Sequence, residues 1–175
     1  MGGIELALQR LFDKYFGSGI RHFGSFLTLI RTSFDLKEPG SGNTIHENIS
    51  SYVDKFQKQE KGARILLKKV EDPERFGVAE FSNSSITRIV EKPKKPKTAF
   101  AVTGVYMYDS QVFNIVRTLK PSGRGELEIT DVNNAYVRNG EMKFDILKGF
   151  WTDAGTFESL LRANNLAKRK VEKVR

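Results

Sequence analysis

The side chains best suited to chemistry gather in a few short segments of this 175-residue chain. Lysine and arginine attract phosphates and other anions, whereas carboxylates bind cations or accept hydrogen bonds from hydroxyls. Glycine and proline within the same segments mark places where the backbone turns or where a ligand can approach it closely. The segments are Glu71-Asp72-Pro73-Glu74-Arg75-Phe76-Gly77-Val78, Val90-Glu91-Lys92-Pro93, Gly123-Arg124-Gly125-Glu126-Leu127-Glu128-Ile129-Thr130-Asp131 and Trp151-Thr152-Asp153-Ala154-Gly155-Thr156.

The chain carries 29 lysines and arginines against 21 acids, a formal net charge of +8. This excess favours a polyanionic partner, and both phosphates and nucleic acid are candidates. It is concentrated at residues 92–97 and in the C-terminal tail, where cations also suit a solvated helix end. Because no motif interleaves aromatic with basic residues, nucleic acid is the less favoured partner.

Composition excludes several other classes of protein. The chain has no cysteine, which excludes disulfides, thiolate metal sites and a cysteine nucleophile. It also has no basic segment followed by a long apolar stretch, and no apolar run of about 18 residues. We therefore expect a globular, cytoplasmic protein that neither spans nor contacts a membrane.

The pattern of apolar residues predicts which elements carry these segments. A helix is expected at 4–16, and no regular element is predicted from 17 to 42. Strands interleaved with helices predict an α/β sandwich with a mixed, mostly parallel sheet flanked by helices. We expect one structural domain, with an atypical N-terminal segment at 1–42 and the main body at 43–175. The predicted elements after Asn43 are a helix at 50–60, strands at 63–70, 76–81, 86–90 and 100–108, helices from 112 and 130, a strand at 142–146, and a helix from 156.

The four segments, together with Ala101-Val102-Thr103-Gly104-Val105-Tyr106 between the second and the third, occur in an order and spacing that resemble the sugar-1-phosphate nucleotidyltransferases. Within that family they are most similar to the glucose-1-phosphate thymidylyltransferases. The resemblance runs from about Asn43 to Leu166 and is specific because five motifs occur in order.

The resemblance implies a partial Rossmann-like fold and the transfer of a nucleotide from dTTP to glucose 1-phosphate, with Mg²⁺ and release of pyrophosphate. It implies that the ammonium of Lys92 pairs with the sugar phosphate and that Glu91 accepts hydrogen bonds from sugar hydroxyls. It implies close backbone approach at Gly77 and sugar-phosphate contacts at Val102, Thr103 and Tyr106. Asp153 would be one of two carboxylates that bind Mg²⁺.

Each of these residues also has an ordinary structural explanation. Glu91 and Lys92 together resemble a solvated ion pair, and Gly77 suits a bulge or a turn. Tyr106 lies in an apolar strand and suits the core, and Asp153 suits a turn before Gly155. Glu126 and Glu128 suit the start of the following helix.

The chain departs from the family pattern at two points. It has no segment of the form Gly-Gly-x-Gly-Thr-Arg-Leu, which in the family binds the triphosphate, and the position of the second metal-binding aspartate reads Gly42 before Asn43. We therefore expect impaired catalysis in a chain that lacks the N-terminal nucleotide-binding portion. A non-catalytic remnant that binds sugar phosphate is the open alternative. An exposed sheet edge would favour a homo-oligomer.

Overall fold

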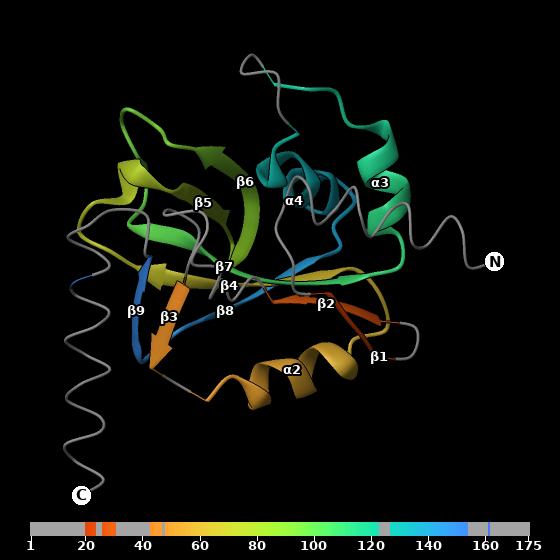
Figure 1. Cartoon of the computed structure of the whole chain (residues 1–175). Coiled ribbons are helices and arrows are strands. Elements are labelled where there is room, and N and C mark those ends of the chain that lie inside the picture. The colour runs from red at the N-terminus through yellow and green to blue at the C-terminus, as the bar shows by residue number, and fades with distance from the viewer. Residues whose placement is uncertain are drawn as a thin grey trace, which may run out of the picture.

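In the computed structural model, the described residues are 20–23, 26–30, 43–46, 48–122, 127–153 and 161. They form a mixed sheet with helices on both faces (Figure 1). The predicted helix at 4–16, the loop at 123–126 and the start of the predicted helix at Thr156 lie outside the described residues. None of the helices in the described ranges is long and apolar enough to cross a membrane.

The main sheet has the strand order β1-β2-β7-β4-β8, and the hairpin β5–β6 branches from β7. Its strands are β1 (Ile20–Phe23), β2 (Phe26–Ile30), β4 (Ala63–Lys69), β5 (Gly77–Ser82), β6 (Ser85–Glu91), β7 (Phe100–Asp109) and β8 (Met142–Ile146). A separate antiparallel pair joins β3 (Asn43–His46) to β9 (Phe150–Asp153).

The expected α/β fold with a mixed sheet is confirmed, but its pairing differs from the expectation. Among the described strands β4 and β8 are parallel, and the other pairs are antiparallel. Connectivity explains two of these pairs: the two-residue turn at Asn83 and Ser84 forces β5 and β6 antiparallel, and the parallel pair of β4 and β8 is joined by a long crossover. Strands β1 and β2 also lie in the segment 17–42, for which the sequence predicts no regular element.

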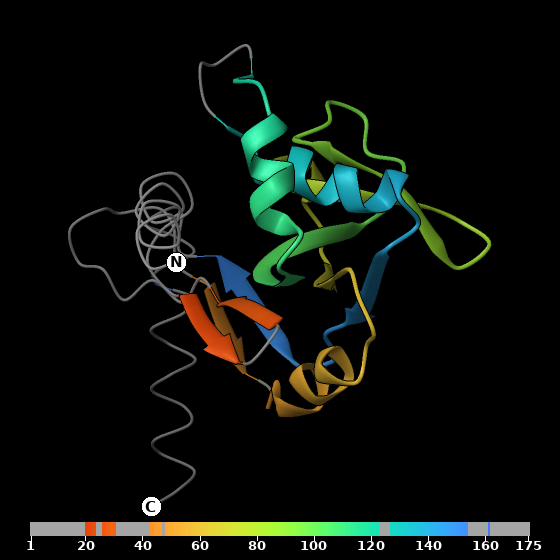
Figure 2. The ribbon, with the colours of Figure 1, turned by 90° about the vertical axis from the view of Figure 1, so that its right-hand side faces the viewer.

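Two layers of helix cover the sheet. On one face lie α3 (Val112–Thr118) and α4 (Ile129–Arg138), and on the other lies α2 (Ser50–Gln57), as Figures 1 and 2 show. Strand alternation explains this arrangement, because successive side chains point to opposite faces. On β4, Ala63, Ile65 and Leu67 pack in the clusters on the α3 and α4 face, whereas Leu66 packs on the α2 face.

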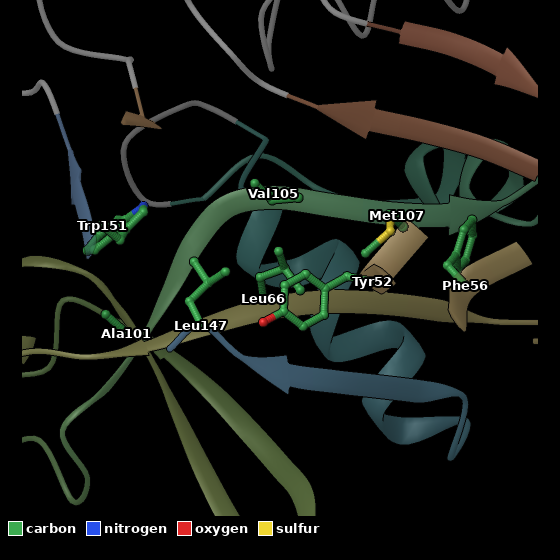
Figure 3. Packing of buried hydrophobic residues seen from close by; sticks show 8 residues of the cluster. All are labelled: Tyr52, Phe56, Leu66, Ala101, Val105, Met107, Leu147 and Trp151. Carbon is green, nitrogen blue, oxygen red and sulfur yellow. The ribbon is translucent and has the colours of Figure 1, made fainter. Parts of the chain in front are cut away.

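The core on the α2 face also extends to the paired strands β3 and β9. Figure 3 shows eight of its buried residues. Phe56 of α2 is fully buried there, and Trp151 of β9 is 7% exposed. Phe76 packs its ring edge against Trp151, with the ring centroids 5.2 Å apart. The segment before β5 is therefore held against β9 by aromatic packing. The buried members of this cluster are Tyr52, Phe56, Leu66, Ala101, Val105, Met107, Leu147 and Trp151.

Candidate functional site

The hairpin β5–β6 brings Gly77 and Glu91 together. Asn83 and Ser84 have φ values of 48° and 63°, the conformation of a tight turn whose twist matches that of the flanking strands. The resulting register places Gly77, the first residue of β5, opposite Glu91, the last residue of β6. A Cβ on Gly77 would lie 3.3 Å from Oε2 of Glu91. Glycine therefore leaves room for the carboxylate at this position.

A hydroxyl from α4 completes this contact. The Oγ1 hydroxyl of Thr130 donates to Oε2 of Glu91 at 2.7 Å, and Thr130 is 7% exposed. Thr130 Oγ1 would also lie 3.6 Å from a Cβ on Gly77. Gly77, Glu91 and Thr130, one residue from each of the first three motifs, thus form one contact group. A charged acceptor makes such a hydrogen bond stronger than a neutral one.

Lys92 follows directly after β6 in an unusual backbone conformation. Its φ is 42°, in the left-handed region, and its N–H donates to the carbonyl oxygen of Phe76 at 3.0 Å. Its side chain is exposed. A non-glycine residue in this conformation costs on the order of 1–3 kcal/mol and persists where the surroundings enforce it. Here the hydrogen bond to Phe76 holds the turn that presents the ammonium to solvent.

A cavity of about 450 Å³ opens between β6 and the start of α4. Its walls carry charges of both signs, with Arg88 and Lys92 among the cations and Glu91, Glu128 and Asp131 among the anions. Such a lining suits a polar ligand that carries both an anionic group and hydroxyls. The other lining residues are Ile89, Val90, Ser122, Thr130 and Asn134.

Asp153, at the end of β9, lies beside the segment before β5. The guanidinium of Arg75 donates through Nη2 to Oδ2 of Asp153 at 3.4 Å and through Nη1 to Oδ2 of Asp72 at 2.7 Å. The hydrogen bond to Asp72 is the main reason that the pKa of Arg75 is raised above its ordinary value, and the charge of Asp153 adds to it. Arg75 therefore stays charged and links the first motif to the last.

The donor set at Asp153 decides whether Mg²⁺ fits there. Within the described ranges, no group of three or more His, Asp or Glu side chains could hold a metal ion. Asn43, which follows Gly42 in the sequence, is the strand partner of Asp153. Mg²⁺ in phosphate-transfer sites is held by one or two carboxylates together with substrate phosphates. Asp153 therefore fits as a single protein ligand that acts with a phosphate-bearing substrate.

The β7 residues divide between the two faces of the sheet. Val102 and Tyr106 are partly buried on the face that α4 covers, and the Tyr106 ring stacks on that of Tyr108 at 6.1 Å. Thr103 points to the other face, where it is fully buried and its hydroxyl donates to the Leu66 carbonyl at 2.8 Å. Val102 and Tyr106 thus share a face with the contact group at Glu91, and the side chain of Thr103 does not.

Sequence reasoning missed Thr130 and Arg75 as members of this site. Thr130 was interpreted only as the start of a helix, and Arg75 was not singled out within its motif. The available signal was their position, because Arg75 stands two residues before Gly77 and Thr130 is the last but one residue of the third motif. Their partners depend on how α4 and β9 pack in three dimensions, which no local pattern encodes.

Gly77, the Glu91–Lys92 pair and Asp153 all lie at strand ends of an α/β fold, as the resemblance to the nucleotidyltransferases implies. The chain belongs to the nucleotidyl transferase family, whose model matches residues 40–170. It is 48% identical over 108 residues to a glucose-1-phosphate thymidylyltransferase of Neisseria meningitidis, covering 60% of this chain and 38% of that protein. It is 36% identical to the low-salt glycan biosynthesis nucleotidyltransferase Agl11 of Haloferax volcanii, covering 71% of this chain and 35% of that protein.

Solved structures agree with the family. A Bacillus anthracis protein assigned as a glucose-1-phosphate thymidylyltransferase, solved with a sucrose, is 54% identical with a TM-score of 0.68. That match covers 71% of this chain and 51% of the other. An apo UDP-glucose pyrophosphorylase, 24% identical with a TM-score of 0.62 over 73% of this chain and 51% of the other, shares the fold. The chain thus spans a little over a third of the length of the curated relatives, up to 38%, and about half of these solved chains.

Proposed function

We propose that this chain binds a sugar 1-phosphate, glucose 1-phosphate in the first instance, as the acceptor half of a nucleotidyltransferase site. The observation that carries the proposal is the contact group of Gly77, Glu91 and Thr130 beside the exposed ammonium of Lys92. Two features of a sugar phosphate, hydroxyls and a dianionic phosphate, match a carboxylate and an ammonium at neighbouring positions.

Each residue then has a separate task. Glu91 accepts hydrogen bonds from sugar hydroxyls, and Lys92 pairs with the phosphate as a point charge. Gly77 lets the sugar approach the backbone closely, and it also leaves space for the Glu91 carboxylate, since a Cβ there would lie 3.3 Å from Oε2. Val102 and Tyr106 line the same face of the sheet. Mg²⁺, when bound through Asp153 and substrate phosphates, would reduce the repulsion between two anionic reactants.

We further propose that nucleotide transfer from dTTP to glucose 1-phosphate is strongly impaired in this chain. A second carboxylate would help Asp153 to hold the Mg²⁺ that stabilises the charge on the phosphates, but the residue before Asn43, the strand partner of Asp153, is Gly42. One preorganised electrostatic contact contributes roughly 3 kcal/mol to the transition state, or about a hundredfold in rate. The same observation favours the second candidate, a sugar-phosphate-binding protein with no turnover.

Calorimetric titration with glucose 1-phosphate tests the binding step. Lys92→Ala removes the ammonium proposed to pair with the phosphate and should weaken binding about tenfold or more, because a hydrogen bond between charged groups is involved. Lys94→Ala is the matched control, since Lys94 is an exposed lysine of the same loop, and should leave the affinity almost unchanged. Equal losses in the two variants would reduce the effect to net charge and overturn the assignment of Lys92.

Pyrophosphate release from dTTP, glucose 1-phosphate and Mg²⁺ tests the transfer step. Gly42→Asp restores the second carboxylate and should raise turnover on the order of a hundredfold if the chain is an impaired enzyme. Binding without turnover in either form would select the non-catalytic candidate. Absence of both binding and turnover would overturn the proposed function.

A further inference from the structure

Helix α4 holds the outer edge of β6 through a side-chain amide. In the described sheet β6 pairs with β5 along one edge, which leaves its other edge without a strand partner. Asn134 fills this edge at one residue: its Oδ1 accepts from the Ile89 N–H at 2.9 Å, and its Nδ2 donates to the Ile89 carbonyl at 2.8 Å. A carboxamide offers one donor and one acceptor side by side, as a neighbouring strand would.

One helical turn earlier, the same face of α4 contacts β6 a second time. Thr130 and Asn134 are four residues apart and therefore lie on one face of the helix. Thr130 donates to the carboxylate of Glu91 at 2.7 Å, two strand residues beyond Ile89. Helix α4 thus contacts β6 twice, through the Asn134 hydrogen bonds to the Ile89 backbone and through the Thr130 hydrogen bond to Glu91. All four residues line the cavity.

We propose that Thr130 and Asn134 are positioning residues for sugar recognition, Thr130 by fixing the orientation of the Glu91 carboxylate and Asn134 by fixing the strand that carries it. The proposal rests on the proposed function, because it assigns a task to Glu91 in that site. Thr130 engages Oε2, and among the described residues no other hydrogen bond to the Glu91 carboxylate is found. The carboxylate therefore keeps acceptor capacity for sugar hydroxyls, and Glu91 lines the cavity.

This arrangement separates recognition of the sugar from recognition of the phosphate. A glutamate side chain has several freely rotating bonds, so an unheld Glu91 would lose conformational entropy each time it bound a hydroxyl. Lys92 is held differently, through its own N–H on the Phe76 carbonyl. Loss of the Thr130 hydroxyl should therefore weaken sugar contacts and spare phosphate contacts.

The first test compares glucose 1-phosphate with inorganic phosphate by calorimetric titration of the whole chain. Thr130→Val removes the hydroxyl at almost constant volume and should weaken glucose 1-phosphate binding about tenfold while phosphate binding is unchanged. Thr130→Ser keeps a hydroxyl and should restore most of the affinity. Thr118→Val, on α3, is the matched control, because the Thr118 hydroxyl donates to a carbonyl of its own helix. A parallel loss for both ligands would show a merely structural role and overturn the proposal.

Glu91→Gln distinguishes failure of this proposal from failure of the proposed function. If the unmodified chain binds glucose 1-phosphate and Glu91→Gln weakens it but Thr130→Val does not, the positioning role is wrong and the proposed function stands. If the unmodified chain does not bind glucose 1-phosphate, or Glu91→Gln leaves its affinity unchanged, the proposed role of Glu91 fails and this inference fails with it.

Amide hydrogen exchange tests Asn134 without any ligand. Asn134→Ala should speed exchange at the Ile89 amide at least tenfold, since that N–H loses its partner at an open strand edge. Asn114→Ala on α3 is the control and should leave the Ile89 amide unaffected. Faster exchange at Ile89 together with an affinity loss for glucose 1-phosphate that spares phosphate would support the positioning role. Unchanged exchange, or faster exchange with no selective affinity loss, would overturn it for Asn134.

Discussion

Two glycines with positive φ allow a sharp test of the turn before β4. Gly62 has a φ of +95° and Gly140 a φ of +70°. A Cβ on Gly62 would lie 2.2 Å from the carbonyl oxygen of Glu141, whereas a Cβ on Gly140 would meet nothing within 4 Å. Substitution by alanine therefore imposes a similar backbone strain at both positions but a steric clash only at Gly62.

The difference in stability follows from these contacts. Alanine at positive φ costs on the order of 1–3 kcal/mol at either position. At Gly62 the backbone must also move, because the clash is with a main-chain oxygen. That oxygen accepts from the N–H of the fully buried Ala63 at 2.9 Å, and an unsatisfied buried donor costs about 1–3 kcal/mol. Because the strain is common to both variants, we expect Gly62→Ala to lower the free energy of unfolding by about 1–3 kcal/mol more than Gly140→Ala.

Urea unfolding followed by far-ultraviolet circular dichroism measures this difference. The comparison requires equal dependence on denaturant in the two variants, so that the midpoints report stability. A difference below about 1 kcal/mol would refute the reasoning, because strain at positive φ alone would then account for both variants. The result bears on the site as well. The Gly62 N–H donates to the Asp109 carboxylate, which also accepts from Tyr136 of α4.

Three further predictions concern charge and protonation. Lys92→Gly removes the ammonium, so the affinity for glucose 1-phosphate should fall. It also relieves the backbone strain of a φ of 42°, so the free energy of unfolding in urea should be unchanged or up to about 1 kcal/mol higher. A lower free energy of unfolding would contradict strain at Lys92. Asp153→Asn should change the free energy of unfolding by less than about 1 kcal/mol, because the ion pair of Asp153 with Arg75 is partly exposed. The same variant should abolish the Mg²⁺ dependence of glucose 1-phosphate binding in calorimetric titration. If that dependence is retained, the metal binds elsewhere. Burial, and then the neighbouring Asp109, raises the pKa of Tyr136 above its ordinary value. The neutral form of Tyr136 therefore contributes stability that is fully present below pH about 10. Above that pH the stability is lost by about 1.4 kcal/mol per pH unit. Above pH about 10, the free energy of unfolding measured with urea should fall less steeply with pH in Tyr136→Phe, by about that slope. Parallel curves for the two proteins would count against a raised pKa of Tyr136.

The elements from Ser50 to Ile146 were predictable because their apolar patterns are local. On β7 the buried residues Ala101, Thr103, Val105 and Met107 alternate with partly buried ones, which is the period of a strand. Helix α4 begins at Ile129 and ends at Arg138, within one or two residues of the start at Thr130 and the stop at Asn139-Gly140 expected from the sequence. Burial on a sheet face or a helix face leaves such periods in the sequence, so these boundaries could be inferred.

The strands β2, β3 and β9 could not be predicted because each depends on a distant partner. Strand β3 pairs with β9, so that Asn43 lies opposite Asp153. Strand β2 adds to the edge of β7 through the short run Phe26–Ile30, which lies in a segment rich in glycines and aromatics without a clear period. A strand of four or five residues has little intrinsic preference, and its pairing is decided by the edge that the rest of the fold offers.

The candidate site, like the fold, could be predicted from the sequence only in part. The motif order suggested that Gly77 and Glu91 belong to one site, and the hairpin register places them opposite each other. The contacts of Thr130 and Asn134 could not be predicted from the sequence, because the packing of α4 against β6 determines which face of α4 contacts Glu91. Assigning catalytic or binding roles to these residues remains a prediction that the titrations above address.

The segment before β5 links the two charged parts of the proposed site. Arg75 contacts the carboxylate of Asp153, and the Phe76 ring packs on Trp151. The Phe76 carbonyl accepts from the N–H of Lys92, and the next residue, Gly77, lies opposite Glu91. Three consecutive residues therefore join the metal-binding carboxylate of the proposal to the backbone of Lys92, which carries the phosphate-binding ammonium. These contacts fix the Lys92 backbone relative to the Asp153 carboxylate, and phosphoryl transfer depends on such positioning of the groups that bind the reactants.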